Sequence, residues 1–500
     1  MASRSPWAIL FVLAAALALI SLDNTIVNVA LPTLQEELGA STAELQWVVD
    51  AYSVLFAGTL LLAGSLGDRF GRRRALVIGL IVFGGGSLAA GFATTADALI
   101  VCRAIMGIGG AFIMPSTLSI LVQVFMDPRA RAQAIGIWAA VAGAAVAIGP
   151  ILGGFLLEVT SWHAIFWVNP PLVVLAMIAT LLLVPESLDP SKPRLDPLGA
   201  VLSTIGIVAF VVTVIEVPDQ GISTVTILST VTAIVFLAAF VWWERRAPRP
   251  LLPMELFANR LFTVAIITVA LVYGALMGVM FFLPQFLQLV QGDSPLASGI
   301  AMLPAAGGLF LASLFSPRWA ERWGTRRIVV LGLVLVVVGL SLAAYLHVGG
   351  SLGLMGLGLG MVLPQATNAV LASVPRERAG MGSAVNDGVG ELGGSLGVAI
   401  LGSLLSLGYR NEIEAQIQAA GDAINTIPAG VVDAVRESLA AGSLAVARLP
   451  SDFATPIREA AGNAFVSGMT TALMVAAAIV AAGAFLAWRM FPARVEKVEE

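Results

Sequence analysis

Runs of about 20 apolar residues recur along the whole of this 500-residue chain. A hydrocarbon core ~30 Å thick is spanned by roughly 20 helical residues, because each residue advances a helix by about 1.5 Å. Backbone groups inside a bilayer must be hydrogen-bonded internally, so such runs fold as helices. Only 12% of the residues are charged, whereas soluble domains contain roughly one quarter. The sequence therefore predicts an all-α polytopic membrane protein.

Fourteen such runs can be counted, and most of the connectors between them are short. They lie at residues 7–30, 46–66, 75–95, 97–123, 133–157, 164–184, 196–216, 223–243, 261–284, 296–315, 327–347, 349–373, 383–408 and 467–488. The first run follows Arg4 as in a signal peptide, but it continues into a polar segment without a convincing cleavage site. We therefore expect it to be retained as the first of 14 transmembrane helices.

The distribution of Lys and Arg predicts that both termini face the cytoplasm, since basic residues gather in cytoplasmic loops. With the N-terminus inside, 22 of the 27 Lys and Arg residues fall in inner segments, and the short outer connectors hold none. Four more lie in the long connector 409–466, where the rule is weak, and Arg103 lies within a span. We expect a multi-pass protein of the cytoplasmic membrane.

Composition argues against several classes of site. Cys102 is the single cysteine, which excludes an intramolecular disulfide and a cysteine metal site. Two histidines, His163 and His347, are too few for a histidine metal cluster. The net charge of −4 and the lack of a long basic block argue against binding of nucleic acid. No nucleotide-binding glycine loop or nucleophile motif is present, which argues against an enzyme.

Three pairs of segments recur in the same order at an offset near 250 residues. They are 68–74 with 321–327, 107–115 with 356–364, and 128–131 with 375–378. A chance match of arginine-rich loops would explain the first pair alone, but not three collinear pairs. Repeated halves that enclose a site at the membrane midplane are typical of transporters. We therefore predict two six-helix halves, residues 1–190 and 251–500, separated by two inserted helices within 191–250.

Charged residues within the predicted spans mark candidate sites, because a charge at bilayer depth costs at least roughly 2.5–3.5 kcal/mol. Asp23 lies ~24 Å along the first span, towards the outer side, and Asp50 lies near the outer end of the second span and can face it. Arg103 lies ~9 Å into its span from outside and needs an acid partner, for which Asp23 is a candidate. The alternative for Asp23 is a position near enough to the helix end to reach water.

The run at 383–408 carries two further acids, Asp387 and Glu391, one helical turn apart on the same face. Two close carboxylates repel each other when both are ionised, which suits a carrier of protons. Glu158 and Glu216 instead lie at outer helix ends, where exposure to solvent is the expected state.

Two glycine-containing segments indicate parts that move or pack closely. The inner loop after the second run contains Gly64, Asp68, Arg69, Gly71 and Arg72. Its glycines allow a tight turn, and Asp68 can act as a latch by pairing with basic groups or a helix N-terminus. Ordinary cytoplasmic topology explains the arginines but not Asp68. The fifth run contains Gly149, Pro150, Gly153 and Gly154, a face that lets a neighbouring helix approach closely, with plain helix packing as the alternative.

Taken together and in order, these segments resemble the major facilitator superfamily, specifically its fourteen-helix drug:proton antiporter branch of the QacA and EmrB type. The matching segments are 23–32, 47–53, 64–73, 103–118, 149–154 and 161–163. The resemblance implies the major facilitator fold and associates the motif at 149–154 with antiport. It also implies functional roles for the acids that match the family's, which are Asp23, Asp50, Asp387 and Glu391.

The function that the resemblance implies is proton-coupled export of amphipathic cations, such as quaternary ammonium compounds and dyes, by a functional monomer. The proton gradient would supply the energy, without a cofactor. Asn386 and Leu309 stand where the QacA type has acids, which puts divalent cations in doubt and leaves monovalent ones. The alternatives are export of an endogenous lipid or secondary metabolite, or a membrane sensor on the same scaffold.

The long outer connector, residues 409–466, is too polar to span a membrane. Its recurring Ile, Val, Leu and Ala residues predict amphipathic helices. We expect a solvated cap, and the alternative is a lid that affects release of the exported cation.

Overall fold

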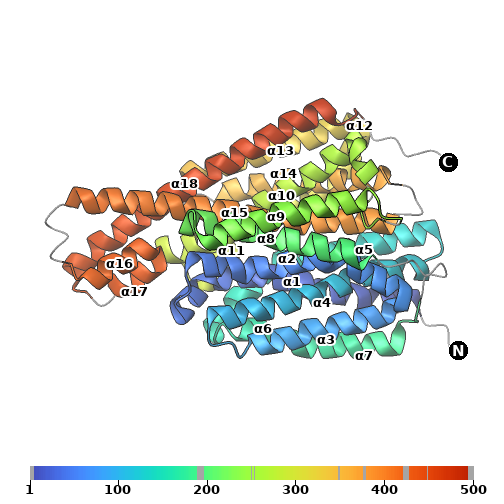
Figure 1. Ribbon diagram of the computed structural model, residues 1–500, viewed down its shortest axis with the longest axis horizontal. Coiled ribbons are helices and arrows are strands. Elements are labelled where there is room, and N and C mark those ends of the chain that lie inside the picture. The colour runs from blue at the N-terminus through green and yellow to red at the C-terminus, as the bar shows by residue number, and fades with distance from the viewer. Residues whose placement is uncertain are drawn as a thin grey trace.

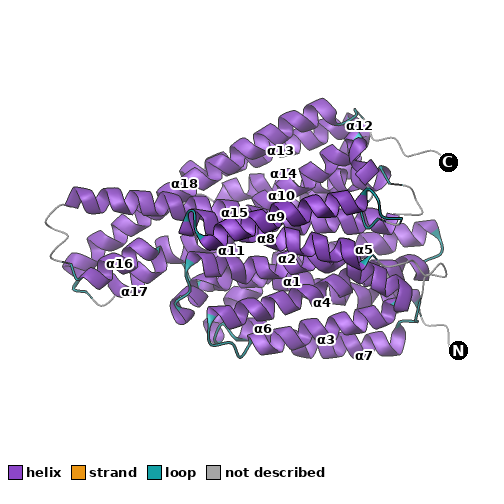
Figure 2. Cartoon of the chain, viewed as in Figure 1, coloured by secondary structure: helices purple, strands orange, loops and turns teal. Residues whose placement is uncertain are grey.

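The computed structural model describes residues 5–187, 196–248, 250–252, 254–346, 349–374, 379–420, 427–446 and 449–493. Within these ranges the backbone is helical, with short loops and no strand (Figure 2). Most of the helices lie side by side along one direction and form a bundle (Figure 1). The predicted all-α class is confirmed.

The first part of the chain forms helices α1 to α9. Their bounds are α1 (Pro6–Leu38), α2 (Thr42–Phe70), α3 (Arg72–Ala90), α4 (Ala96–Val124), α5 (Pro128–Val159), α6 (Ala164–Trp167), α7 (Asn169–Leu183), α8 (Pro197–Gln220) and α9 (Thr224–Glu244). The remainder forms η1 (Met254–Ala258), α10 (Arg260–Gln285), η2 (Phe286–Val290), α11 (Pro295–Ala301), α12 (Leu303–Trp323), α13 (Thr325–Leu346), α14 (Gly349–Ala372), α15 (Ala379–Ala420), α16 (Ala429–Glu437), α17 (Leu439–Val446) and α18 (Ser451–Met490).

Among the described residues, twelve helical segments are long and apolar enough to cross a membrane. Each coincides with one of the predicted spans. The two remaining predicted spans, 46–66 and 133–157, fall within α2 and α5, which are 29 and 32 residues long. The chain is therefore a multi-pass membrane protein, and the count of fourteen spans stays a prediction.

The internal repeat is visible in matching turns of the backbone. Gly71 ends α2 with φ +122° and Gly324 ends α12 with φ +90°, a region of backbone space that favours glycine. Each glycine N–H bonds the carbonyl four residues earlier, at 2.9 Å to Gly67 and 2.8 Å to Ala320. The two loops that the sequence pairs thus have the same local structure.

Matching helix crossings extend the repeat. A Cβ added to Gly109 of α4 would lie 2.5 Å from the backbone nitrogen of Phe83 in α3. A Cβ added to Gly358 of α14 would lie 2.4 Å from the carbonyl oxygen of Gly332 in α13. Both pairs of residues are 249 apart along the chain, from 109 to 358 and from 83 to 332. The glycines therefore let equivalent helices approach equally closely in both parts of the bundle.

Contacts between the two parts of the bundle run along three seams, which are α2 with α15, α5 with α11, and α1 with α10. Helices α8 and α9 pack on each other, and α8 also contacts both α2 and α15. Helix α8 therefore lies across one seam, and α9 packs on α8.

The outer connector is largely helical, as its apolar pattern predicts, but the boundaries of the flanking spans differ from those predicted. Helix α15 continues to Ala420 and α18 begins at Ser451, so that each is a continuous helix of 42 or 40 residues. The apolar run underestimates the length of such a helix, because the part of the helix that extends into solvent does not have the apolar composition of a span. With α16 and α17, these extensions project from one end of the bundle, opposite the start of α1 and the end of α18 (Figure 1).

Candidate functional site

Asp23 and Arg103 form a buried ion pair between α1 and α4. The guanidinium Nη1 of Arg103 donates to Asp23 Oδ2, and both side chains are 1% exposed. Asn169 of α7 donates from Nδ2 to Asp23 Oδ1 at 3.0 Å. Asp23 therefore lies inside the protein and does not reach water at the helix end. The pairing answers the need of a buried arginine for an acid.

Arg103 is held by α2 as well. Its Nε donates to the carbonyl oxygen of Val48 at 3.0 Å, and its guanidinium carbon lies 4.6 Å from the centre of the Tyr52 ring. Glycines make room for this contact, since a Cβ on Gly107 would lie 2.2 Å from the Tyr52 carbonyl oxygen and one on Gly110 would lie 2.6 Å from its hydroxyl. Three helices, α1, α2 and α4, therefore share one buried charge pair.

A second layer of polar groups supports Asp23. Asn169 Nδ2 also lies 3.0 Å from Ser87 Oγ on α3, and Ser87 in turn donates to the carbonyl oxygen of Phe166 at 2.8 Å. Ser87 and Asn169 are both fully buried. Sequence reasoning missed both residues, although a buried Asn before two prolines within an apolar run is a detectable signal.

Glu391 joins the two parts of the bundle. It lies on α15, and its Oε2 accepts from Ser53 Oγ of α2 at 3.0 Å while its Oε1 accepts from Asn24 Nδ2 of α1 at 3.4 Å. Both donors are neutral, in contrast to the charged partner of Asp23. Asn24 and Ser53 lie within segments that the sequence singles out, but their contact with Glu391 was not predicted.

Asp387 lies one turn before Glu391 on α15 and is half-buried. Asn386 donates from Nδ2 to Asp387 Oδ1 at 3.1 Å. Tyr273 of α10 interacts electrostatically with both acids, and a Cβ added to Gly390 would lie 3.2 Å from its ring. The two acids predicted to share a face thus meet a common aromatic neighbour.

Asp50 is fully buried on α2 and lies beside Ser395 of α15. Neither carboxylate oxygen of Asp50 has a hydrogen-bond partner among the described residues, and the same holds for the Ser395 hydroxyl. The seam between α2 and α15 therefore holds two acid–serine neighbours, since Glu391 and Ser53 lie next along it.

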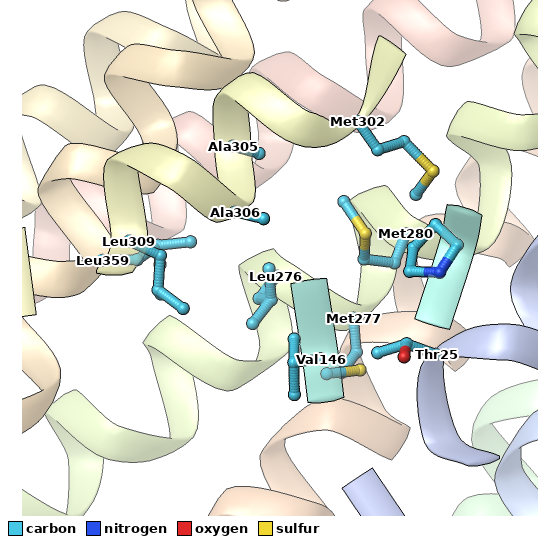
Figure 3. A pocket seen from close by; sticks show the side chains of 11 residues that line it. Thr25, Val146, Leu276, Met277, Met280, Met302, Ala305, Ala306, Leu309 and Leu359 are labelled. Atoms are coloured by element: carbon cyan, nitrogen blue, oxygen red, sulfur yellow. The ribbon is translucent and has the colours of Figure 1, made fainter. Parts of the chain in front are cut away.

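An apolar cavity lies between α1 and α5 on one side and α10, α12 and α14 on the other (Figure 3). Three methionines, Met277, Met280 and Met302, point into it together with Leu309 (Figure 3). Leu309 is the position where the sequence departs from the acid of the QacA type, so this departure leaves the wall apolar. Met277 also lies beside α15, because a Cβ on Gly394 would lie 3.0 Å from it.

The glycine–proline motif of α5 packs against both parts of the bundle. A Cβ on Gly149 would lie 2.0 Å from Thr25 Oγ1, and one on Gly153 would lie 2.9 Å from the Ile26 side chain, both on α1. Gly154 and Pro150 face α11, where a Cβ on Gly154 would lie 2.4 Å from the Pro295 carbonyl oxygen. The small residues are thus required by close approach on both sides of the α5 helix.

The segment predicted as a latch loop is not a loop for most of its length, because α2 continues to Phe70 and only Gly71 separates it from Arg72 at the start of α3. The side chain of Asp68 lies outside the described residues, and Arg69 is exposed with its guanidinium carbon 5.5 Å from the Phe70 ring centre. A Cβ on Gly64 would lie at an ordinary 3.7 Å from Pro115, so packing there does not require glycine.

Glu186, an acid that sequence reasoning missed, lies against the turn at Gly71 between α2 and α3. Its Oε1 accepts from the backbone N–H of Arg73 at 3.0 Å, and its Oε2 lies 3.8 Å and 3.7 Å from the Nε atoms of Arg73 and Arg74. The backbone N–H of Arg72 bonds the Ser187 carbonyl oxygen at 2.9 Å. The chain after α7 therefore closes over the start of α3.

Comparison with known proteins decides the family. Residues 13–398 match the family profile described as Major Facilitator Superfamily. The chain belongs to the major facilitator superfamily. No group of three or more metal-binding side chains occurs within the residues that the structure describes. Superfamily membership identifies the chain as a transporter.

Relatives within the superfamily match over nearly the whole chain. The multidrug efflux pump LfrA of Mycolicibacterium smegmatis is 37% identical over 496 residues, covering 96% of each protein. The tetracenomycin C resistance and export protein of Streptomyces glaucescens is 31% identical, over 96% of this chain and 91% of that protein. The methyl viologen resistance protein SmvA of Salmonella typhimurium is 32% identical, over 95% of this chain and 96% of that protein.

A solved structure supports the major facilitator fold. The chain aligns with a bacterial homologue of the human lysosomal transporter Spinster, in an inward-facing and unoccupied conformation, with a TM-score of 0.67. Sequence identity is 19% and 98% of each chain is covered. The predicted major facilitator fold is confirmed, whereas the roles of the individual site residues stay predictions.

Proposed function

We propose that this protein exports monovalent amphipathic cations across the cytoplasmic membrane in exchange for protons, without a cofactor and as a monomer. The multidrug efflux and resistance proteins that it resembles over at least 95% of its length support drug export. The arrangement of its buried acids supports the exchange with protons.

The observation that carries the proposal is the environment of Glu391. A carboxylate in a low-dielectric site with neutral partners is stabilised by taking up either a proton or a cation. Glu391 has such partners, Asn24 and Ser53, and they belong to the opposite part of the bundle. Binding of a proton or a cation to Glu391 therefore affects the contact between the two parts, and any rocking of one part against the other depends on that contact.

Asp23 has a different role in this proposal. Its charge is already neutralised by Arg103, and the pair is closed off from water. It therefore holds α1 and α4 together, and its partner Arg103 interacts electrostatically with Glu391. Exchange is assigned to the partly buried Glu391, with Asp387 as its neighbour and the fully buried Asp50 on the same seam.

The apolar body of a substrate would lie among the methionines of the cavity between the two parts. Methionine side chains are flexible and polarizable, so they adapt to ligands of different shape. Met277 contacts α15 next to the turn that carries Glu391. The cavity has a volume of only about 40 Å³ in this conformation, so the rings or chains of an amphipathic cation would enter it, with the charge near the acids, once the two parts move apart.

Proton and cation compete for the same carboxylates, so each lowers the affinity for the other. Binding of a proton from outside releases the drug, and binding of drug from inside releases the proton. The halves alternate between inward and outward access around the same site.

Uptake of an ethidium-like dye into everted vesicles tests the proposal. An acid vesicle interior should drive accumulation of dye, and an uncoupler should abolish it. Glu391→Gln should reduce the gradient-driven uptake at least tenfold, because its side chain binds neither a proton nor a cation. Glu414→Gln, on the exposed outer extension of α15, is the control and should transport normally. Uptake that persists with the uncoupler, or unchanged coupling in Glu391→Gln, would refute the assignment.

Export of a secondary metabolite is the second candidate function. It is favoured by the similarity to the Streptomyces tetracenomycin C resistance and export protein. A vesicle assay that compares neutral or anionic metabolites with cationic dyes separates the two. Faster transport of the uncharged compounds would favour this candidate.

A further inference from the structure

A shallow pocket at the cytoplasmic end of the second half contains three arginines. The turn between α12 and α13 forms one wall, and Ala493, three residues beyond the end of α18, lies on the other side. The lining residues are Arg322, Trp323, Gly324, Arg326, Arg327 and Ala493. The Ala493 carbonyl oxygen lies against the turn, 2.6 Å from the position of a Cβ on Gly324.

The equivalent turn of the first half shows what this backbone accepts. There, Glu186 places its carboxylate over Gly71, where a Cβ would lie 2.7 Å from Oε1. The same carboxylate accepts the Arg73 N–H and lies within 4 Å of both Arg73 and Arg74. The first-half turn is therefore an occupied anion site, and its anion is part of the chain.

Among the residues that the structure describes, the second-half turn has the arginines without an acid. Arg326 and Arg327 correspond to Arg73 and Arg74 in the sequence repeat. Across the described part of the chain, no carboxylate lies within 4 Å of Arg322, Arg326 or Arg327, and the adjacent Glu321 pairs with none of them. The Ala493 carbonyl carries only a partial charge and cannot neutralise three guanidinium groups.

The location selects the class of anion. The turn lies at the cytoplasmic end of two membrane-spanning helices, and the Trp323 side chain beside it is 47% exposed, as is typical of residues at the membrane surface. Guanidinium groups bind phosphate oxygens in a bidentate manner, and basic pockets on the cytoplasmic side of membrane proteins bind anionic headgroups.

We propose that this pocket binds the phosphodiester of an anionic phospholipid, with Arg326 and Arg327 as the principal contacts and Arg322 at the rim. The lipid phosphate takes the place that Glu186 takes in the first half. It therefore fixes the start of α13 through a ligand from the membrane, whereas the start of α3 is fixed by the chain itself.

Binding of phosphatidylglycerol to delipidated protein in detergent, followed by native mass spectrometry, tests the proposal. Arg326→Gln/Arg327→Gln should weaken binding about 25-fold, the product of about fivefold for each arginine near an anionic surface. Arg246→Gln is the matched control, because Arg246 is a cytoplasmic arginine stacked on Trp242 at 4.5 Å and lies outside the pocket. It should retain the affinity of the unmodified protein.

Two further comparisons identify the ligand. Phosphatidylcholine, with the same acyl chains and no net charge, should bind at least tenfold more weakly, and soluble glycerol phosphate should not compete at equal concentration. Glu186→Gln should create a second anionic lipid site of similar affinity in the first half. Equal binding by the double arginine variant, equal binding of phosphatidylcholine, or full competition by glycerol phosphate would each overturn the proposal. Melting temperatures without lipid establish that the variants are folded.

Discussion

Breaking the Asp23–Arg103 pair from one side should destabilise the protein more than removing both charges. Asp23→Asn keeps the shape of the side chain and the contact with Asn169, but it leaves the Arg103 guanidinium buried without a counter-charge. Both side chains are 1% exposed, so water cannot replace the missing carboxylate.

The expected magnitude follows from the contacts that remain. Removing one partner of a buried ion pair costs about 3–5 kcal/mol. In Asp23→Asn, Arg103 keeps its bond to the Val48 carbonyl and its position over the Tyr52 ring. The loss should therefore lie at the lower end, about 3 kcal/mol, and Arg103→Gln should cost a similar amount. The double variant leaves no buried charge without a partner. We therefore expect it to lower the free energy of unfolding by about 2 kcal/mol, which gives a coupling energy of about 4 kcal/mol between the two positions.

Unfolding of the four proteins in mixed micelles measures this coupling. The exposed pair of Arg436 and Glu414, with side chains 43% and 49% exposed and 3.0 Å apart, is the control. Glu414→Gln should cost less than about 1 kcal/mol, because exposed pairs are screened by water. A double variant whose loss equals the sum of the two single losses would show that Asp23 and Arg103 are not coupled, and the reasoning from burial would fail.

Three other substitutions have definite expected outcomes. Gly149→Ala should lower stability by about 1–3 kcal/mol and slow transport, because the added methyl lies 2.0 Å from Thr25 Oγ1. Gly143→Ala is the control, because a Cβ there meets no atom within 4 Å, and it should change neither stability in an unfolding assay nor transport in a dye-efflux assay. Tyr52→Phe should match the unmodified protein in stability, since the buried hydroxyl has no hydrogen-bond partner among the described residues. Loss of the ring in Tyr52→Leu should lower stability by about 1 kcal/mol through the lost contact with Arg103. Asn386→Asp should raise export of divalent relative to monovalent cations in vesicle uptake, because it adds a carboxylate to the α15 site, and an unchanged ratio would count against a role for this position.

Much of the fold could be predicted because the bilayer restricts it. A span must be long, apolar and helical, so the apolar runs located the helices, and the arginine-rich loops located the repeat. The limits of α15 and α18 could not be predicted in the same way. Beyond the membrane a helix needs no apolar composition, and their extensions to Ala420 and from Ser451 carry polar residues.

The candidate site was predictable only where one residue demands another. A buried Arg103 requires an acid, and Asp23 was the available one. The partners of Glu391 could not be predicted in this way, because it accepts hydrogen bonds from the neutral side chains of Asn24 and Ser53, which lie 367 and 338 residues away along the chain. Glu186 was missed for a related reason. It lies in a connecting segment, and no periodic pattern relates such a segment to the start of α3.

The two longest helices have a mechanical consequence. With 40 residues, α18 is ~60 Å long, about twice the thickness of the hydrocarbon core, and α15 is of similar length. A tilt of the second half would therefore be amplified at their outer ends, where α16 and α17 lie. Ser438, at the start of α17, accepts a hydrogen bond from Gln35 of α1 at 3.0 Å, which tethers this lever to the first half. Opening of the outer side would have to break this hydrogen bond or move α16 and α17 together with α1. A molecule that binds the outer helices can therefore favour one state of the transport cycle.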